Sequence, residues 1–280
     1  MLAAGAQRTS RLRLGTLITI LSLHHPMRVV EEAVTLDQLS GGRLDLGVGR
    51  GVSPAELAFH GVSGEEEAQG RFDEAFAILR QGLTSDGVTF DGKYYKLLDA
   101  PVISRPVQRP HPPLWYGTRT PAKAQWCARL GMPMMALVPS EAVRVLTDAY
   151  PAEWASLGRS LDDLPPLGIS RNMVLAPTGE EAMKIADRAF VRFKGSLCYL
   201  WKKYGIPVPP VFPAETFAGI HAVGHFYAGD PAGAREWAAR HRDLGGINYM
   251  ALETCFGDMT GDEALRSAEL LATEVMPHFA

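Results

Sequence analysis

The residues best suited to bind a ligand lie in two short segments, each directly after a predicted strand. The first segment is Gly47-Val48-Gly49-Arg50-Gly51. Glycine lets a ligand approach the backbone closely, and a guanidinium can bind a phosphate through two hydrogen bonds. The glycine spacing is not that of a dinucleotide-binding loop. The segment therefore indicates either an anion site built around Arg50 or a tight turn that leaves Arg50 exposed.

The second segment, Gly117-Thr118-Arg119-Thr120-Pro121-Ala122-Lys123, leaves a predicted strand and begins a helix. The unpaired N–H groups and the dipole of a helix start favour a phosphate. A lysine near the third helical position opposes that dipole by about 0.3–1 kcal/mol unless an anion lies nearby. A solvated helix start is the alternative. We favour phosphate binding and expect Arg50 and Arg119 to converge on one phosphorylated ligand.

Other residues carry weaker signals for chemistry. Barrel metal sites use His-x-His on a strand, whereas adjacent histidines such as His24-His25 point to opposite sides, so we expect no metal and favour loop packing or pocket lining. Aromatic side chains could line a flat ring system or simply fill the core. These aromatic candidates are Phe59-His60, Trp115-Tyr116 and Trp201. No nucleophile elbow, phosphate-binding P-loop or acid–base pair is recognisable, so the catalytic residues stay unassigned.

The overall composition is that of a soluble globular protein. The chain has 280 residues, 46% of them apolar and 21% charged, with a net charge of −3. This balance gives no electrostatic argument for nucleic acid or an anionic membrane. The cysteines Cys127, Cys198 and Cys255 have neither metal-ligand spacing nor an even number, and we expect Cys127 to be a small core residue. No apolar run is long enough to span a bilayer, and we expect a cytoplasmic protein.

The elements that must position these segments alternate between short strands and amphipathic helices, which is typical of a parallel sheet covered by helices. Helix starts are indicated at Pro26, Ser53-Pro54, Thr120-Pro121, Thr178 and Thr260. The barrel-type strands are expected at 11–21, 43–48, 114–117, 134–138, 168–175 and 247–252. A hairpin over Val88–Leu97 and proline-rich stretches interrupt this alternation, so we expect excursions near 85–113 and 205–225.

These six strands fall short of the eight that a closed (β/α) barrel contains. Each missing βα unit takes roughly 30 residues or more. The first residues, Met1–Ala6, read as the end of a helix. We therefore predict an α/β fold of the (β/α)8 TIM-barrel type, as a single domain over 1–280, that lacks the first two βα units.

Several stretches, in this order along nearly the whole chain, closely resemble the bacterial luciferase-like flavin-dependent monooxygenases. The stretches are Arg11–Thr16, His24-His25-Pro26, Glu31-Glu32, Leu36–Arg43, Gly47–Gly51, Pro106-Val107-Gln108, Pro110–Gly117, Ala264–Ser267 and Val275-Met276-Pro277. Each of them is weak by itself, but together they are specific.

The resemblance implies a (β/α)8 barrel, a reduced FMN or deazaflavin cofactor and a homodimer. It implies that Arg50, between Gly49 and Gly51, contacts the flavin phosphate, and that Thr16 lies near the ring. The loop that wraps the same phosphate corresponds to Gly117, Thr118, Arg119 and Thr120. Arg119 stands where a small polar residue is expected. Nothing in the chain matches the two βα units with which the family normally begins, so no catalytic residue can be carried over from them.

The sequence therefore predicts a two-component monooxygenase that uses reduced FMN and O2 on a small organic substrate. A separate flavin reductase would supply the reduced flavin, because the chain has no nicotinamide-binding fingerprint. Two alternatives remain open: an oxidoreductase of the same fold that depends on the deazaflavin F420, and a non-catalytic barrel fragment that associates with another chain through its open sheet edges. A metal-dependent barrel hydrolase that uses His24 or His25 is a further, weaker alternative.

Overall fold

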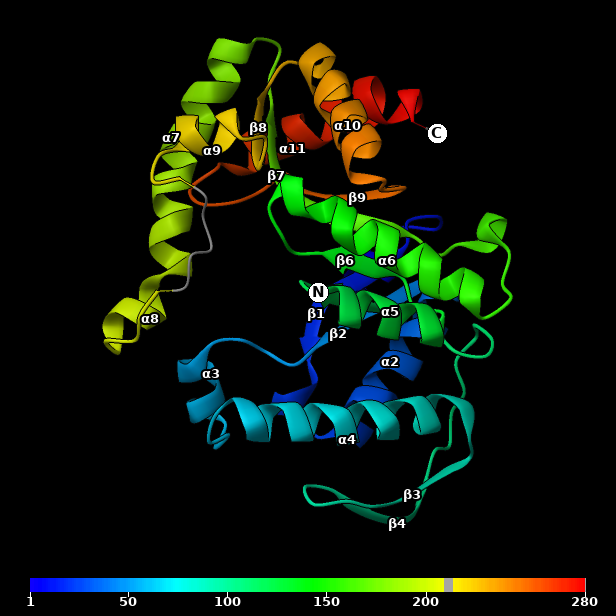
Figure 1. The fold of residues 1–280 in the computed structure, drawn as a ribbon. Coiled ribbons are helices and arrows are strands. Elements are labelled where there is room, and N and C mark those ends of the chain that lie inside the picture. The colour runs from blue at the N-terminus through cyan, green and yellow to red at the C-terminus, as the bar shows by residue number, and fades with distance from the viewer. Residues whose placement is uncertain (209–213, 280) are drawn as a thin grey trace. The chain divides into compact units, whose positions relative to one another are not determined.

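The computed structural model describes residues 1–208 and 214–279, which group into two compact units, Met1–Gly117 and Thr118–Ala280. In both units, parallel strands alternate with helices along the chain (Figure 1). The predicted α/β fold with a mostly parallel sheet is thereby confirmed. None of the helices in the described residues is long and apolar enough to cross a membrane.

The first unit contains a parallel sheet in the order β1-β2-β5, with Leu14 paired to Leu44 and Leu46 paired to Leu114. The strands are β1 (Leu14–Ile20), β2 (Leu44–Gly49) and β5 (Leu114–Thr118). The helices are α1 (Leu2–Arg8), α2 (Pro26–Ser40), α3 (Pro54–Phe59) and α4 (Glu65–Thr84), with a 3-10 turn at Leu21–Leu23. The predicted hairpin is present as β3 (Gly87–Asp91) and β4 (Lys96–Pro101).

Helix α2 shows how local sequence sets an element of this unit. Pro26 occupies the first turn, and Gly41 ends the helix in the left-handed conformation with φ of 65°. Val30 and Val34 lie on the buried face, and burying a side chain of this size stabilises the fold by about 1.5–3 kcal/mol. Asp37 on the same helix is fully buried, and it accepts hydrogen bonds from the backbone N and side-chain Nε2 of Gln108.

The second unit is organised around the long strand β7 (Leu167–Leu175), to which β6, β8 and β9 pair in parallel. These partners are β6 (Met134–Ala136), β8 (Phe226–Gly229) and β9 (Tyr249–Glu253). The helices are α5 (Pro121–Leu130), α6 (Val143–Ser156), α7 (Gly179–Leu197), α8 (Tyr199–Lys203), α9 (Phe217–Ala222), α10 (Pro231–Gly245) and α11 (Gly261–Leu270). A π-helical turn (Leu271–Val275) and 3-10 turns at Ser140–Ala142, Leu161–Asp163 and Met276–His278 complete the unit.

Both faces of the end of β7 are covered by helices, with α7 and α10 on opposite sides of β7 and β8 (Figure 1). Val174 packs on one face among α7 residues and a group of phenylalanines. Met173 and Leu175 pack on the other face against Ala234 of α10. A strand buried on both faces reads as a continuous apolar run, which is why Met173–Leu175 shows no alternation.

The structure corrects the predicted strand count. The described residues contain seven parallel strands rather than six, because β8 (Phe226–Gly229) went unrecognised. The irregular excursion expected near 205–225 includes the short helix α9, and its residues 209–213 lie outside the described residues. Strand β1 is also shorter than the predicted 11–21, since a 3-10 turn begins at Leu21. Closure into an eight-stranded barrel, the two absent βα units and the single domain over 1–280 stay predictions.

Candidate functional site

The loop after β2 places Arg50 directly at the carboxyl end of a buried strand. Packing explains the two flanking glycines, because a Cβ on Gly49 would lie 2.0 Å from Ile18 Cδ1, and Gly51 has φ of 86°. The hydroxyl of Ser22 donates a hydrogen bond to the backbone O of Arg50 and fixes the turn. The backbone conformation thus favours glycine at Gly51, and a side chain at Gly49 would require Ile18 to move. The ligand argument therefore depends on the Arg50 side chain.

The guanidinium of Arg50 is only loosely paired. Its Nη1 lies 3.5 Å from Oε2 of Glu65, whose side chain is 81% exposed, whereas the Arg50 side chain is 25% exposed. A long ion pair with one solvated partner contributes about 0–1 kcal/mol. Arg50 is therefore a cation at a strand end that can exchange a weak partner for a stronger anionic one.

Thr16 lies in the same unit, on β1 beside β2. Its Oγ1 donates to the backbone O of Gly47 at 2.9 Å and accepts from Oγ1 of Thr19 at 3.1 Å. The hydroxyl of Thr16 thus links β1 to β2 through a hydrogen bond. Thr16, Gly49, Arg50 and Gly51 all belong to the first unit, but in the register of β1 and β2 Thr16 lies beside Leu46, whereas Ile20 lies beside Gly49. Their convergence on one cofactor stays a prediction.

The second predicted segment forms a compact turn into α5. Thr118 is buried, and its Oγ1 accepts a hydrogen bond from Thr120 N at 3.2 Å. Thr120 is the N-cap of α5 and accepts from Lys123 N at 3.4 Å. Arg119 is exposed, and Nζ of Lys123 lies 4.9 Å from the ring centre of Trp126. The start of α5 offers an N-terminal dipole, while the exposure of Arg119 equally fits the solvated alternative.

Gly117 ends the first unit, whereas Thr118, Arg119 and Thr120 belong to the second. The expected convergence of Arg50 and Arg119 on one ligand stays a prediction.

A polar pair that the sequence analysis missed lies on neighbouring strands of the second unit. Asn172 and Glu253 are register partners on β7 and β9, and Nδ2 of Asn172 donates to Oε2 of Glu253 at 2.7 Å. Burial raises the pKa of Glu253, and the hydrogen bond from Asn172 partly opposes that rise. Glu253 is the last residue of β9, so this carboxyl also lies at a strand's carboxyl end, where the residue is exposed.

Among the weaker candidates, the histidine pair and Trp115-Tyr116 follow their structural alternatives, whereas Phe59 and His60 are exposed and are not part of the core. His25 packs edge-on against Tyr95, with ring centres 5.8 Å apart, and Tyr95 Oη donates to His24 O at 3.5 Å. The histidine pair therefore packs a loop. Trp115 and Tyr116 are each 8% exposed and belong to the core. Cys127 is fully buried, as predicted, and burial raises the pKa of its thiol to about 12.

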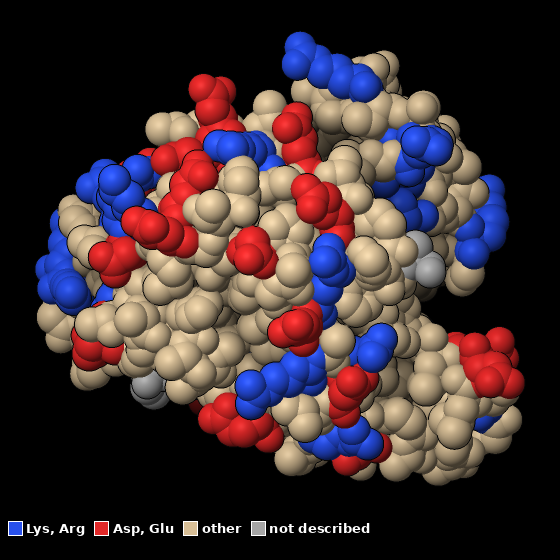
Figure 2. Space-filling model, turned by 90° about the horizontal axis from the view of Figure 1, so that it is seen from above, with Lys and Arg blue, Asp and Glu red and all other residues tan. Residues whose placement is uncertain are grey.

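Charged side chains are mixed in sign over the surface. Figure 2 shows Lys and Arg interspersed with Asp and Glu across the face in view. This mixing accords with the net charge of −3. Anion binding in this chain therefore depends on local groups such as Arg50 and not on a single-sign field.

The family model described as luciferase-like monooxygenase matches residues 1–252. Among curated proteins, the uncharacterized protein y4wF of Sinorhizobium fredii is 36% identical over 275 residues, which cover 98% of this chain and 80% of that protein. Limonene 1,2-monooxygenase of Rhodococcus erythropolis is 28% identical over 292 residues, covering 99% of this chain and 72% of that protein.

Solved structures show the same architecture. Monooxygenase RslO1 from Streptomyces bottropensis matches with a TM-score of 0.88 and 28% identity, over 100% of this chain and 82% of that chain. Two further structures share the fold at lower identity. The oxygenating constituent of 3,6-diketocamphane monooxygenase from Pseudomonas putida, in complex with FMN, has a TM-score of 0.75 at 19% identity, over 99% of this chain and 82% of that one. The coenzyme F420-dependent tetrahydromethanopterin reductase from Methanopyrus kandleri has a TM-score of 0.73 at 23% identity, over 100% of this chain and 86% of that one.

Proposed function

Because the chain belongs to the luciferase-like monooxygenase family, we propose that it oxygenates a small organic substrate with reduced FMN and O2. In this proposal, a separate flavin reductase supplies the reduced cofactor, and the protein acts in the cytoplasm as a homodimer. The observation that carries the proposal is the loosely paired guanidinium of Arg50 at the carboxyl end of β2. In parallel α/β folds, ligands bind at the carboxyl ends of the strands.

The donor groups at the two predicted segments fit the phosphate of FMN. Arg50 offers a planar guanidinium that can bind a phosphate with two parallel hydrogen bonds. The start of α5, in the second unit, offers backbone N–H groups and the Thr120 hydroxyl, and is proposed to bind the cofactor as well. Phosphate-binding chemistry is thus present at both segments without a metal ion.

The residues of the chain bind and orient the reactants and hold protons. When bound, reduced flavin supplies the two electrons with which one atom of O2 becomes water while the other enters the substrate. Glu253 is proposed to hold or deliver a proton, because burial raises the pKa of its carboxyl and Asn172 fixes its orientation. Thr16, near the amino-terminal end of β1, holds β1 beside β2 through its bond to Gly47 and is proposed to lie near the ring.

A second candidate function is a deazaflavin-dependent oxidoreductase. The F420-dependent reductase from Methanopyrus kandleri has the same fold, and its match covers this whole chain. Such an enzyme would transfer a hydride and would need no O2. The phosphate-binding groups of this chain serve either cofactor, so the cofactor itself has to be identified.

Parallel titrations of the purified chain test the proposal. FMN, F420 and riboflavin are added separately, and binding is followed by the fluorescence and absorption of each cofactor. We expect saturable binding of FMN, and weaker binding of riboflavin because it lacks the phosphate. Selective binding of F420 would favour the second candidate, and binding of none of the three would refute both.

A further inference from the structure

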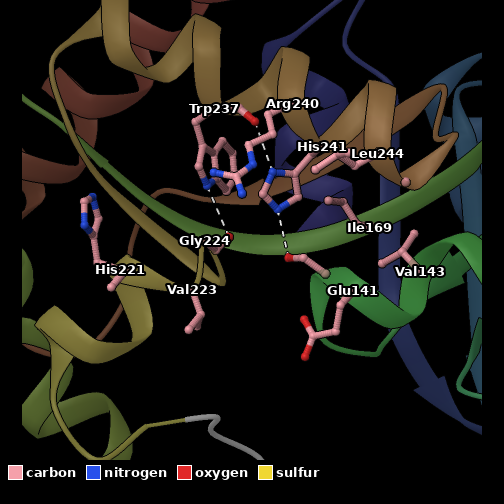
Figure 3. A pocket seen from close by; sticks show the side chains of 13 residues that line it. Glu141, Val143, Ile169, His221, Val223, Gly224, Trp237, Arg240, His241 and Leu244 are labelled. Carbon is pink, nitrogen blue, oxygen red and sulfur yellow. Dashed lines mark hydrogen bonds between the residues drawn. The ribbon is translucent and has the colours of Figure 1, made fainter.

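A cavity of about 420 Å³ lies in the second unit, and none of the residues that line it belongs to the strand-end segments around Arg50 and Thr120. It is enclosed by β7, the start of α6 and the helix α10, with the end of α9 at its mouth (Figure 3). The apolar part of its wall comes from Val143, Ile169, Val223, Trp237 and Leu244. This volume suits a small organic molecule.

A buried guanidinium adjoins this cavity without an acidic partner. Arg171 is 3% exposed, and it donates to Ser170 O at 2.8 Å, to Val138 O at 3.1 Å and to Oγ of Ser140 at 3.3 Å. Its Nε is buried and has no hydrogen-bond partner, and within the described residues Arg171 makes no ion pair. Its hydrogen bonds all go to neutral groups, and the charge of the exposed Glu141 acts on it without forming an ion pair. This is unusual, because a paired opposite charge normally compensates the desolvation of a buried cation.

Arg171 lies on the cavity side of its strand. Ile169 lines the cavity, and residues two apart on a strand project to the same face, so the Arg171 side chain leaves β7 toward the same space. Ser140, which accepts one of its hydrogen bonds, also lines the cavity. The positive charge of Arg171 therefore lies behind the part of the cavity wall that Ser140 forms.

The buried imidazole of His241 and the partly buried imidazole of His225 complete this polar end. His241 lines the cavity, and its Nδ1 donates to Trp237 O at 3.0 Å, so that Nε2 accepts from Oγ of Ser140 at 3.1 Å (Figure 3). His225 follows the cavity residue Gly224, and its buried Nδ1 has no partner. Burial and the charge of Arg171 lower the pKa of both imidazoles, that of His225 to about 4.

We propose that this cavity binds a small organic anion, with its oxyanion head beside Ser140, Arg171 and the two imidazoles and its apolar body against Trp237 and Leu244. An oxyanion beside Ser140 would place a negative charge near Arg171, whose hydrogen bonds all go to neutral groups. The charged groups at the rim are Arg240, which favours an anion, and the exposed Glu141, which opposes one. The proposal is independent of the flavin assignment, because it uses none of the strand-end residues.

Titration of the histidine rings by proton NMR tests the site directly. The C2–H signals of His225 and His241 are assigned with the variants His225→Gln and His241→Gln and followed between about pH 4 and 8. The probes are hexanoate, inorganic phosphate and the uncharged 1-hexanol. A negative charge within hydrogen-bonding range raises an imidazole pKa by about one unit or more. We expect this rise in the imidazole pKa with hexanoate. A similar rise with inorganic phosphate would show that an oxyanion binds without an apolar body.

The controls separate charge recognition from simple apolar filling. Arg171→Met should abolish the rise, and if that variant does not fold, Ser140→Ala should reduce the affinity for hexanoate about tenfold. Lys184→Gln removes an exposed positive charge from α7 and should leave the affinity unchanged. Equal effects of hexanoate and 1-hexanol, or no shift of either imidazole with any probe, would overturn the proposal. In that case Arg171 only caps the carbonyls of Val138 and Ser170.

Discussion

The substitution Arg50→Gln tests the phosphate assignment quantitatively. Hydrogen bonds from a charged donor contribute about 1.5–3 kcal/mol each. The competing pair with Glu65 is long and solvated, so giving it up on binding costs about 0–1 kcal/mol. For the loss of one such bond, the net change of about 0.5–3 kcal/mol corresponds to a Kd for FMN that is roughly 2- to 160-fold higher in Arg50→Gln.

Fluorescence titrations with FMN and riboflavin measure this effect, with Glu65→Gln as the matched control. Glu65→Gln removes the competing carboxylate, so its Kd for FMN should be unchanged or a few-fold lower. Riboflavin has no phosphate, and its weaker binding should be the same in all three proteins. The reasoning is wrong if Arg50→Gln binds FMN as the parent does, or if FMN and riboflavin lose affinity equally.

Three further predictions concern stability and reactivity. Tyr150→Phe should lower the free energy of unfolding by about 1–3 kcal/mol in a urea titration, because the fully buried Tyr150 hydroxyl donates to Met132 O at 2.9 Å and that carbonyl would be left unpaired. Burial lowers the pKa of His225 to about 4 in the folded protein, whereas the usual pKa of a histidine is 6.5. Between these two pH values the unfolded chain binds more protons than the folded one, so the free energy of unfolding should fall as the pH drops from about 6.5 to 4. His225→Gln should flatten this decline by about 1–2 kcal/mol after allowance for solvent screening, and an unchanged pH profile would contradict the assignment. A thiol reagent should modify the exposed Cys255 quickly and the buried Cys127 only after unfolding, since burial raises the pKa of Cys127 to about 12; rapid labelling of Cys127 in the native protein would show that it is accessible.

Most helices could be predicted because the residues that begin and end each helix lie close together in the sequence. Gly41 and Gly131 adopt left-handed conformations at helix C-termini, and Thr260 forms the expected capping box with Glu263. These signals need only neighbouring residues, so they are visible without tertiary structure. The long strand β7 was equally visible as an apolar run.

Strand β8 could not be recognised because its pairing is not local. Phe226–Gly229 has only four residues, and all of them are buried, so no alternation marks it. It is held by pairing with Asn172–Leu175, more than fifty positions earlier, and by Phe190 and Phe217. A short buried run beside a helix start reads equally well as a loop.

The polar groups of the candidate sites also differ in whether they are close together or far apart in the sequence. The segments around Arg50 and Thr120 are contiguous and follow strands, so anion binding can be proposed for them from the sequence alone, and it stays a prediction. Asn172 and Glu253 lie 81 positions apart, and Ser140 and His241 lie 101 apart. These residues meet only when strands and helices pack together, so no sequence motif predicts their hydrogen bonds.

A crystal structure of the chain with FMN tests the central claim most directly. The account predicts the flavin phosphate within about 3 Å of the Arg50 guanidinium, which will have turned away from Glu65. A bound flavin whose phosphate lies elsewhere, with Arg50 still paired to Glu65, would contradict it.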